Sequence, residues 1–87
     1  MEFVKRAERN IMPKQSLDNL PLYQSGEIIA IDGDETIKNK LKSMGILVGL
    51  TVTVLKRHQR TPSIIQIGEA KLAVGRTIMQ AIQVKAR

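Results

Sequence analysis

The stretch KSMGILVGLTV, residues 42–52, decides the fold because it joins a predicted helix to a predicted strand. Two glycines, Gly45 and Gly49, stand on either side of three aliphatic residues. Gly45 suits the position just after a helix, where the backbone often takes a positive φ that glycine adopts readily. Gly49 then leads the chain into a strand that begins near Thr51. We therefore interpret the stretch as a structural joint.

The joint is neither a membrane span nor a phosphate loop. The apolar run from Met44 to Leu55 is only 12 residues long, whereas a spanning helix needs about 20. A phosphate loop requires a lysine directly after its second glycine, and neither Gly45 nor Gly49 has one. The N-terminus lacks the continuous apolar region of a secretory signal, and the chain has no cysteine. We therefore expect a cytoplasmic protein.

Hydrophobic periodicity predicts a strand and a helix before the joint. GEIIAI, residues 26–31, is a short isoleucine-rich strand. A helix over about 33–44 follows, because its apolar residues recur at helical spacing along one stripe. Asp32 and Glu35 have the spacing of a capping box at the start of this helix. The stripe consists of Ile37, Leu41 and Met44.

Further elements are predicted after the joint. TVTVLKR, residues 51–57, alternates apolar and polar residues as a half-buried strand does. SIIQIGEAKLAV, residues 63–74, is typical of a hairpin with a type II′ turn at Gly68. RTIMQA, residues 76–81, forms one or two helical turns, and AIQV, residues 81–84, closes the pattern as a last strand.

The sequence predicts two parts of the chain, an N-terminal extension and one folded domain. We expect residues 1–15 to be an extension, either flexible or folded as a short helix over 3–10. Residues 16–87 form the domain, which opens with SLDNLP; here Ser16 caps a single turn that presents Leu17 and Leu20. With 87 residues there is room for one domain. About five short strands and one helix predict a mainly β fold, a small, partly open barrel.

The net charge of +6 and the pI of about 10.1 raise the question of a nucleic-acid partner. The charge is spread along the chain, and Phe3 and Tyr23 are the only aromatic residues. Successive bases therefore have no set of rings on which to stack. We expect no nucleic acid as a partner, with a basic RNA-binding or ribosome-associated protein as the alternative function.

Metal binding and catalysis have few candidate residues. Asp32, Asp34 and Glu35 supply carboxylates and His58 is the only histidine, but an iron site usually needs more than one imidazole. The acids suit the start of the helix instead. No base and nucleophile stand in a recognisable pattern. We expect no metal site, no cofactor and no enzymatic activity, and keep a metal-sensing domain as a further alternative.

The middle of the joint carries the candidate contact residues. Ile46 should anchor the helix end, whereas Leu47 and Val48 lie at a turn where polar residues are usual. Lys38 and Lys42 share a helix face four residues apart. We hypothesise that Leu47, Val48, Lys38 and Lys42 form part of a surface that meets a partner.

The ordered set of motifs resembles the FeoA family. The matching features run from Ser16 to Val84. They are SLDNLP, Gly26, the helix end at Leu41 to Ile46 with Gly49, the strands around Val52 and Ile65, Gly75-Arg76, and Ala81-Ile82 with Val84. This chain has Lys38-Asn39-Lys40 where similar proteins are often arginine-rich, and Leu47-Val48 where a proline often precedes the second glycine.

The resemblance implies an SH3-like β-barrel with an inserted helix. It also implies a role in bacterial ferrous iron uptake, in support of the membrane GTPase-permease FeoB. The protein would then be peripheral to the membrane, attached only through this partner. Because a short open barrel has free edge strands, a homo-oligomer remains an alternative. The same module forms the last domain of DtxR-type repressors, whose other domains do not fit into this chain.

Overall fold

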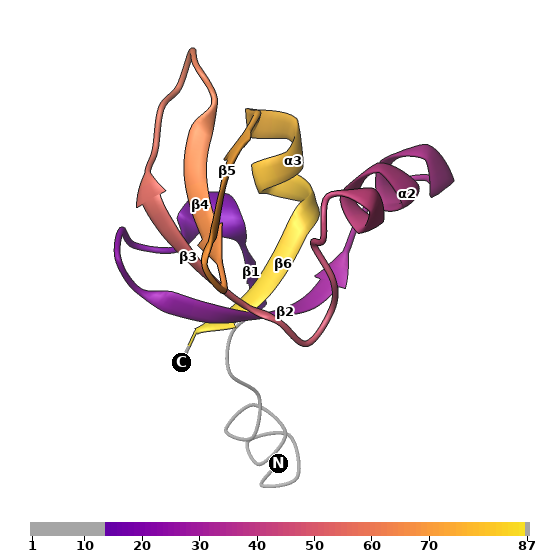
Figure 1. Cartoon of the computed structure of the whole chain (residues 1–87), viewed down its shortest axis with the longest axis horizontal. Coiled ribbons are helices and arrows are strands. Elements are labelled where there is room, and N and C mark those ends of the chain that lie inside the picture. The colour runs from indigo at the N-terminus through magenta and orange to yellow at the C-terminus, as the bar shows by residue number, and fades with distance from the viewer. Residues whose placement is uncertain (1–13, 87) are drawn as a thin grey trace, which may run out of the picture.

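The computed structural model describes residues 14–86, which form a curled antiparallel sheet, two helices and one 3-10 turn (Figure 1). The predicted short helix in the extension lies outside the described residues. The division at residue 16 stays a prediction, although the first strand already begins at Lys14. The elements are β1 (Lys14–Ser16), η1 (Leu17–Asn19), β2 (Ser25–Ile31), α2 (Glu35–Ser43), β3 (Thr51–Lys56), β4 (Ser63–Ile67), β5 (Ala70–Val74), α3 (Arg76–Ala81) and β6 (Ile82–Ala86).

The sheet has the strand order β1-β6-β2-β3-β4-β5, and every pairing is antiparallel. Because β1 and β5 are its two edges, the barrel is open, as predicted. The mainly β class is confirmed, but the sheet has six strands instead of about five. The additional strand β1 consists of Lys-Gln-Ser, which has no apolar alternation from which a strand could be predicted.

The core lies inside the curl of the sheet, under η1 and α3. Strands β2 and β3 alternate between buried and partly exposed residues, so one side of each faces the core. Gly26 of β2 marks a close approach, since a Cβ there would lie 3.3 Å from the Cβ of Val84. The core residues are Leu17, Leu20, Ile28, Leu41, Ile46, Val52, Val54, Ile65, Val74, Met79, Ile82 and Val84.

Helix α2 begins two residues later than predicted and has a different cap. The side chain of Asp34 accepts a hydrogen bond from the Ile37 amide at 3.0 Å. The prediction of Asp32 as the cap is therefore wrong. Gly33, with φ of 130°, turns the chain between Asp32 and the helix, and Asp32 instead accepts a hydrogen bond from Gln83 Nε2 at 2.9 Å.

The C-terminus of α2 is closed by a Schellman motif. The Ile46 amide donates to the Leu41 carbonyl at 2.9 Å, and the Gly45 amide donates to the Lys42 carbonyl at 3.0 Å. Gly45 has a φ of 84°, which this motif requires of the residue after the cap. The predicted helix end is confirmed at Gly45, and so is the apolar stripe, with Leu41 fully buried.

Two local predictions on the rest of the domain, the hairpin and the SLDNLP turn, are confirmed. The hairpin of β4 and β5 is confirmed, with Ile67 opposite Ala70 and a positive φ of 62° at Gly68. The turn over SLDNLP is also present and buries Leu17 and Leu20. Ser16 occupies the N-cap position of this turn, as predicted, but its side chain makes no capping hydrogen bond. The Leu20 amide closes the turn by donating to the Leu17 carbonyl at 3.1 Å, and a distant arginine donates further bonds to it.

Candidate docking groove

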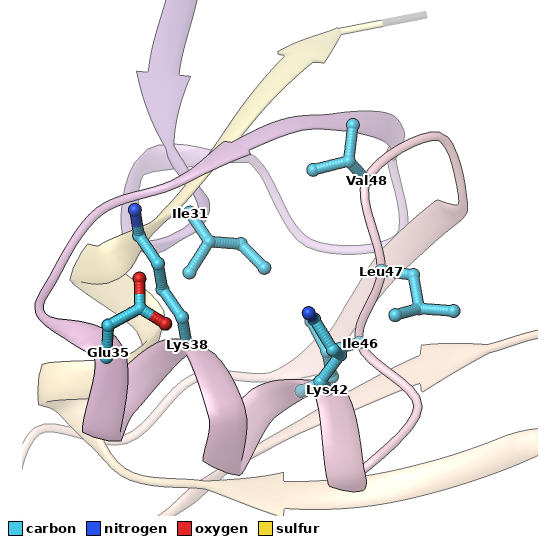
Figure 2. A pocket seen from close by; sticks show the side chains of 7 residues that line it. All are labelled: Ile31, Glu35, Lys38, Lys42, Ile46, Leu47 and Val48. Carbon is cyan, nitrogen blue, oxygen red and sulfur yellow. The ribbon is translucent and has the colours of Figure 1, made fainter.

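A groove of about 480 Å³ lies between α2 and the joint (Figure 2). One wall is the exposed face of α2, the other is the loop after the helix, and Ile31 at the end of β2 lies between them. The lining residues are Ile31, Glu35, Lys38, Lys42, Ile46, Leu47 and Val48. The structure therefore brings together all four residues that the sequence singled out for a partner surface.

A tight turn holds the second wall of the groove in place. The Leu50 amide donates to the Leu47 carbonyl at 3.3 Å, and Gly49 has a φ of 99°, as the third residue of a type II turn requires. Two further bonds tie the turn to β2, from the Gly49 amide to the Ile28 carbonyl at 2.7 Å and from the Ile28 amide to the Leu50 carbonyl at 2.9 Å. The wall is therefore part of the sheet framework.

The three aliphatic residues of the joint differ in burial: the one expected to anchor the helix end is buried, and the two at the turn are exposed. Ile46 is fully buried, whereas Leu47 is 43% and Val48 61% exposed. Hydrogen bonds to β2 fix the turn that carries these two side chains. The fold therefore holds both side chains in contact with solvent. Exposed aliphatic side chains on a rigid concave surface are typical of contact sites.

The charged residues of the groove all come from α2. Lys38 and Lys42 rise from one face of the helix, beside Glu35 from its first turn (Figure 2). Both lysines are exposed, and the lining carries two ammonium groups for one carboxylate. The groove therefore combines an apolar side with a weakly positive side.

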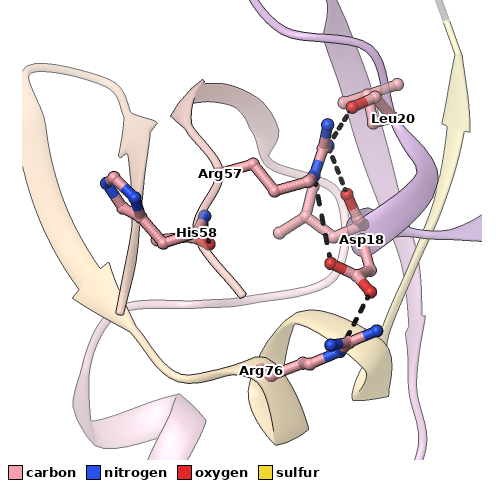
Figure 3. A network of polar contacts seen from close by, with 7 residues as sticks. Asp18, Leu20, Arg57, His58 and Arg76 are labelled. Atoms are coloured by element: carbon pink, nitrogen blue, oxygen red, sulfur yellow. Dashed lines mark hydrogen bonds and ion pairs between the residues drawn. The ribbon is translucent and has the colours of Figure 1, made fainter. Parts of the chain in front are cut away.

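A second constellation, formed by Asp18, Arg57 and Arg76, was not predicted. The carboxylate of Asp18 lies between the two guanidinium groups, 3.9 Å from Nε of Arg57 and 3.8 Å from Nε of Arg76 (Figure 3). Arg57 also donates to the carbonyls of Leu17 and Leu20. The cluster therefore fastens the η1 turn to the end of β3 and to α3, which makes its role structural.

Two of the acids considered for a metal site have hydrogen-bond partners of their own, and the histidine lies beyond β3. Asp34 caps α2 and Asp32 pairs with Gln83, while His58 follows β3 and points away from the Asp18 cluster (Figure 3). Among residues 14–86, no group of three or more His, Cys, Asp or Glu side chains could hold a metal ion. Across the same residues, no helix has the length and apolar character that a bilayer span demands.

The curled sheet, the helix inserted between β2 and β3 and the short helix before β6 define the class: a small SH3-like β domain. A sequence model described as FeoA domain matches residues 15–86. The chain therefore belongs to the FeoA family, whose members are small accessory domains associated with ferrous iron transport.

Solved structures agree with this assignment. An iron uptake regulatory protein (FeoA) superposes with a TM-score of 0.79 at 28% identity, over 86% of this chain and 100% of that one. FeoA from Stenotrophomonas maltophilia, solved with zinc, has a TM-score of 0.69 at 20% identity, over 82% and 89% of the two chains. Among curated proteins, none matches the sequence significantly.

The same fold also occurs inside a larger regulator. A manganese-dependent transcriptional repressor superposes with a TM-score of 0.81 at 23% identity. The match covers 88% of this chain but only 44% of the repressor. At this identity the match shows the fold alone.

Proposed function

We propose that the protein is a cytoplasmic accessory component of bacterial ferrous iron uptake that docks onto the membrane transporter FeoB through the groove between α2 and the joint. The observation that carries the proposal is the exposure of Leu47 and Val48 on a turn that is bonded to the sheet. Their burial by a partner would remove apolar surface from water without a change in the fold.

The chemistry of the groove suggests what part of the transporter fits. An apolar side chain would contact Leu47 and Val48, and a carboxylate beside it would meet Lys38 and Lys42. Lysines bind carboxylates as point charges without the bidentate geometry of arginine. Charge would therefore contribute mainly to the association rate, and apolar contact to the lifetime of the complex.

We further propose that the protein acts by binding and performs no catalysis of its own. The charged lining residues are two lysines and one glutamate from a single helix, an arrangement that offers no nucleophile oriented by a base. Any effect on iron uptake would then appear as a change in the activity of the transporter.

The test is co-purification of the protein with FeoB from detergent-solubilised membranes, together with the GTPase and iron-uptake rates with and without it. We expect retention of the protein on the transporter and a change in at least one rate. A protein that neither binds the transporter nor changes a rate would contradict the proposal.

The alternative functions are separated by two further measurements. A gel shift with single-stranded RNA that weakens steeply with salt would favour the RNA-binding alternative. An anaerobic titration with Fe(II) or Mn(II) that saturates at one ion per chain would favour a metal sensor.

A further inference from the structure

Tyr23, in the loop between η1 and β2, combines an unusual backbone with high exposure. Within residues 14–86 it is the only residue other than glycine with a positive φ, 66°, and it is 72% exposed. Its amide donates to the Val54 carbonyl at 2.8 Å, which fixes its position beside β3. Bulky residues adopt the left-handed region at a cost in free energy, whereas Asn and Gly enter it readily. Folding alone therefore does not explain a tyrosine here.

Tyr23 borders a second hollow, of about 500 Å³, on the outer face of β3, β4 and β5. Val54 and Ile65 of these strands point into the core, so their neighbours Leu55, Ile64 and Gln66 point outward. Leu55 and Ile64 are half-buried and supply an apolar surface. The hollow lies on a different side of the sheet from the core and shares no lining residue with the groove at α2.

The charge of this hollow is entirely positive. Lys56 from β3 and Lys71 from β5 line it, both exposed, and no acidic residue is among its lining residues. The groove at α2, by contrast, includes Glu35. An apolar surface with a ring and two ammonium groups around it is complementary to an apolar side chain that lies between carboxylates.

We propose that the hollow formed by Tyr23, Leu55, Lys56, Ile64, Gln66 and Lys71 is a second docking site, which binds an acidic protein segment with an aliphatic or aromatic residue between its carboxylates. The carboxylates pair with Lys56 and Lys71, and the apolar residue packs on Tyr23, Leu55 and Ile64. Single-stranded nucleic acid fits less well, because one ring cannot stack successive bases. A bilayer fits less well because the site is concave.

The test uses the emission of Tyr23 itself. The chain has one tyrosine and no tryptophan, so tyrosine fluorescence reports on this hollow alone. The probe is the peptide acetyl-Glu-Glu-Leu-Glu-Glu-amide, titrated at low salt, with the same peptide carrying Gln for every Glu as its uncharged match. We expect a saturable change with the acidic peptide, and for the double variant Lys56→Gln/Lys71→Gln an affinity about tenfold lower.

Two variants separate this site from the groove and from the fold. Lys38→Gln/Lys42→Gln removes two lysines of the same kind from the groove, and we expect unchanged peptide affinity. Tyr23→Asn suits the left-handed backbone, so it should lose the peptide-induced NMR shifts of the Ile64 and Gln66 amides without a lower melting temperature.

Several results would overturn the proposal. In the titration, these are the absence of any emission change with the acidic peptide and an equal response to the Gln peptide. In thermal unfolding, it is a lower melting temperature of Tyr23→Asn, which would mean that the tyrosine stabilises the fold. Saturation by phosphatidylglycerol vesicles or by a single-stranded oligonucleotide, where the peptide gives none, would replace the acidic segment by that ligand. Because no groove residue takes part, these results are independent of the proposed docking onto FeoB.

Discussion

The amide of Ile46 donates a hydrogen bond to the carbonyl of Leu41 at 2.9 Å, across the end of α2. Both side chains are fully buried in the same core. The bond therefore ties the helix end, the core and the start of the joint into one unit. Since Leu47 directly follows Ile46, the motif that ends the helix also positions the apolar side of the groove.

Gly45→Ala should destabilise the protein by about 1 kcal/mol, the cost of a left-handed backbone for an L residue. A Cβ at this position would meet no atom within 4 Å, so the backbone conformation alone is responsible. Gly45→Asn should cost less, because asparagine tolerates this region. Urea unfolding measures both values. Equal losses for Ala and Asn would contradict the backbone explanation.

Val48→Pro should stabilise the protein by about 0.4–1 kcal/mol. Val48 is the second residue of the turn from Leu47 to Leu50, a position where proline is common. Within residues 14–86, no carbonyl accepts a hydrogen bond from the Val48 amide, so its loss removes no bond. A lower urea midpoint for this variant would show that the turn does not have the type II geometry assigned to it.

Arg57→Ala should cost about 2 kcal/mol in unfolding free energy, because it removes charged hydrogen bonds to the carbonyls of Leu17 and Leu20. Arg76→Ala makes a matched comparison. It also faces Asp18, but its side chain is more exposed, so its loss should cost less than about 0.5 kcal/mol. Thermal unfolding of the two variants at the same pH gives the comparison. Equal destabilisation would mean that the carbonyl bonds of Arg57 contribute nothing.

The sequence predicts best where a short segment contains all the residues involved. The helix end at Gly45, the apolar stripe that contains Leu41 and the hairpin at Gly68 each depend on neighbours within a few positions. The exposure of Leu47 and Val48 follows in the same way from their place in a turn. These features can be predicted from local chemistry.

Features that join distant parts of the chain could not be predicted. Arg57 bonds the Leu20 carbonyl 37 residues away, and no local pattern relates the two. The hollow at Tyr23 combines a loop with three strands, so a single tyrosine gives no sign of it. The cap at Asp34 was missed because Asp32 and Glu35 have the spacing of a capping box, while the φ of Gly33 becomes known only from the structure.

The most direct test of the central claim is the affinity of FeoB for Leu47→Ser/Val48→Ser. Leu22→Ser is the matched control, since Leu22 is 43% exposed like Leu47 but does not line the groove. We predict that the double variant binds about 10- to 100-fold more weakly because the apolar contact is lost. The control should bind like the wild type, and the melting temperature of both variants should change little. Wild-type binding by the folded double variant would contradict the groove as the docking site.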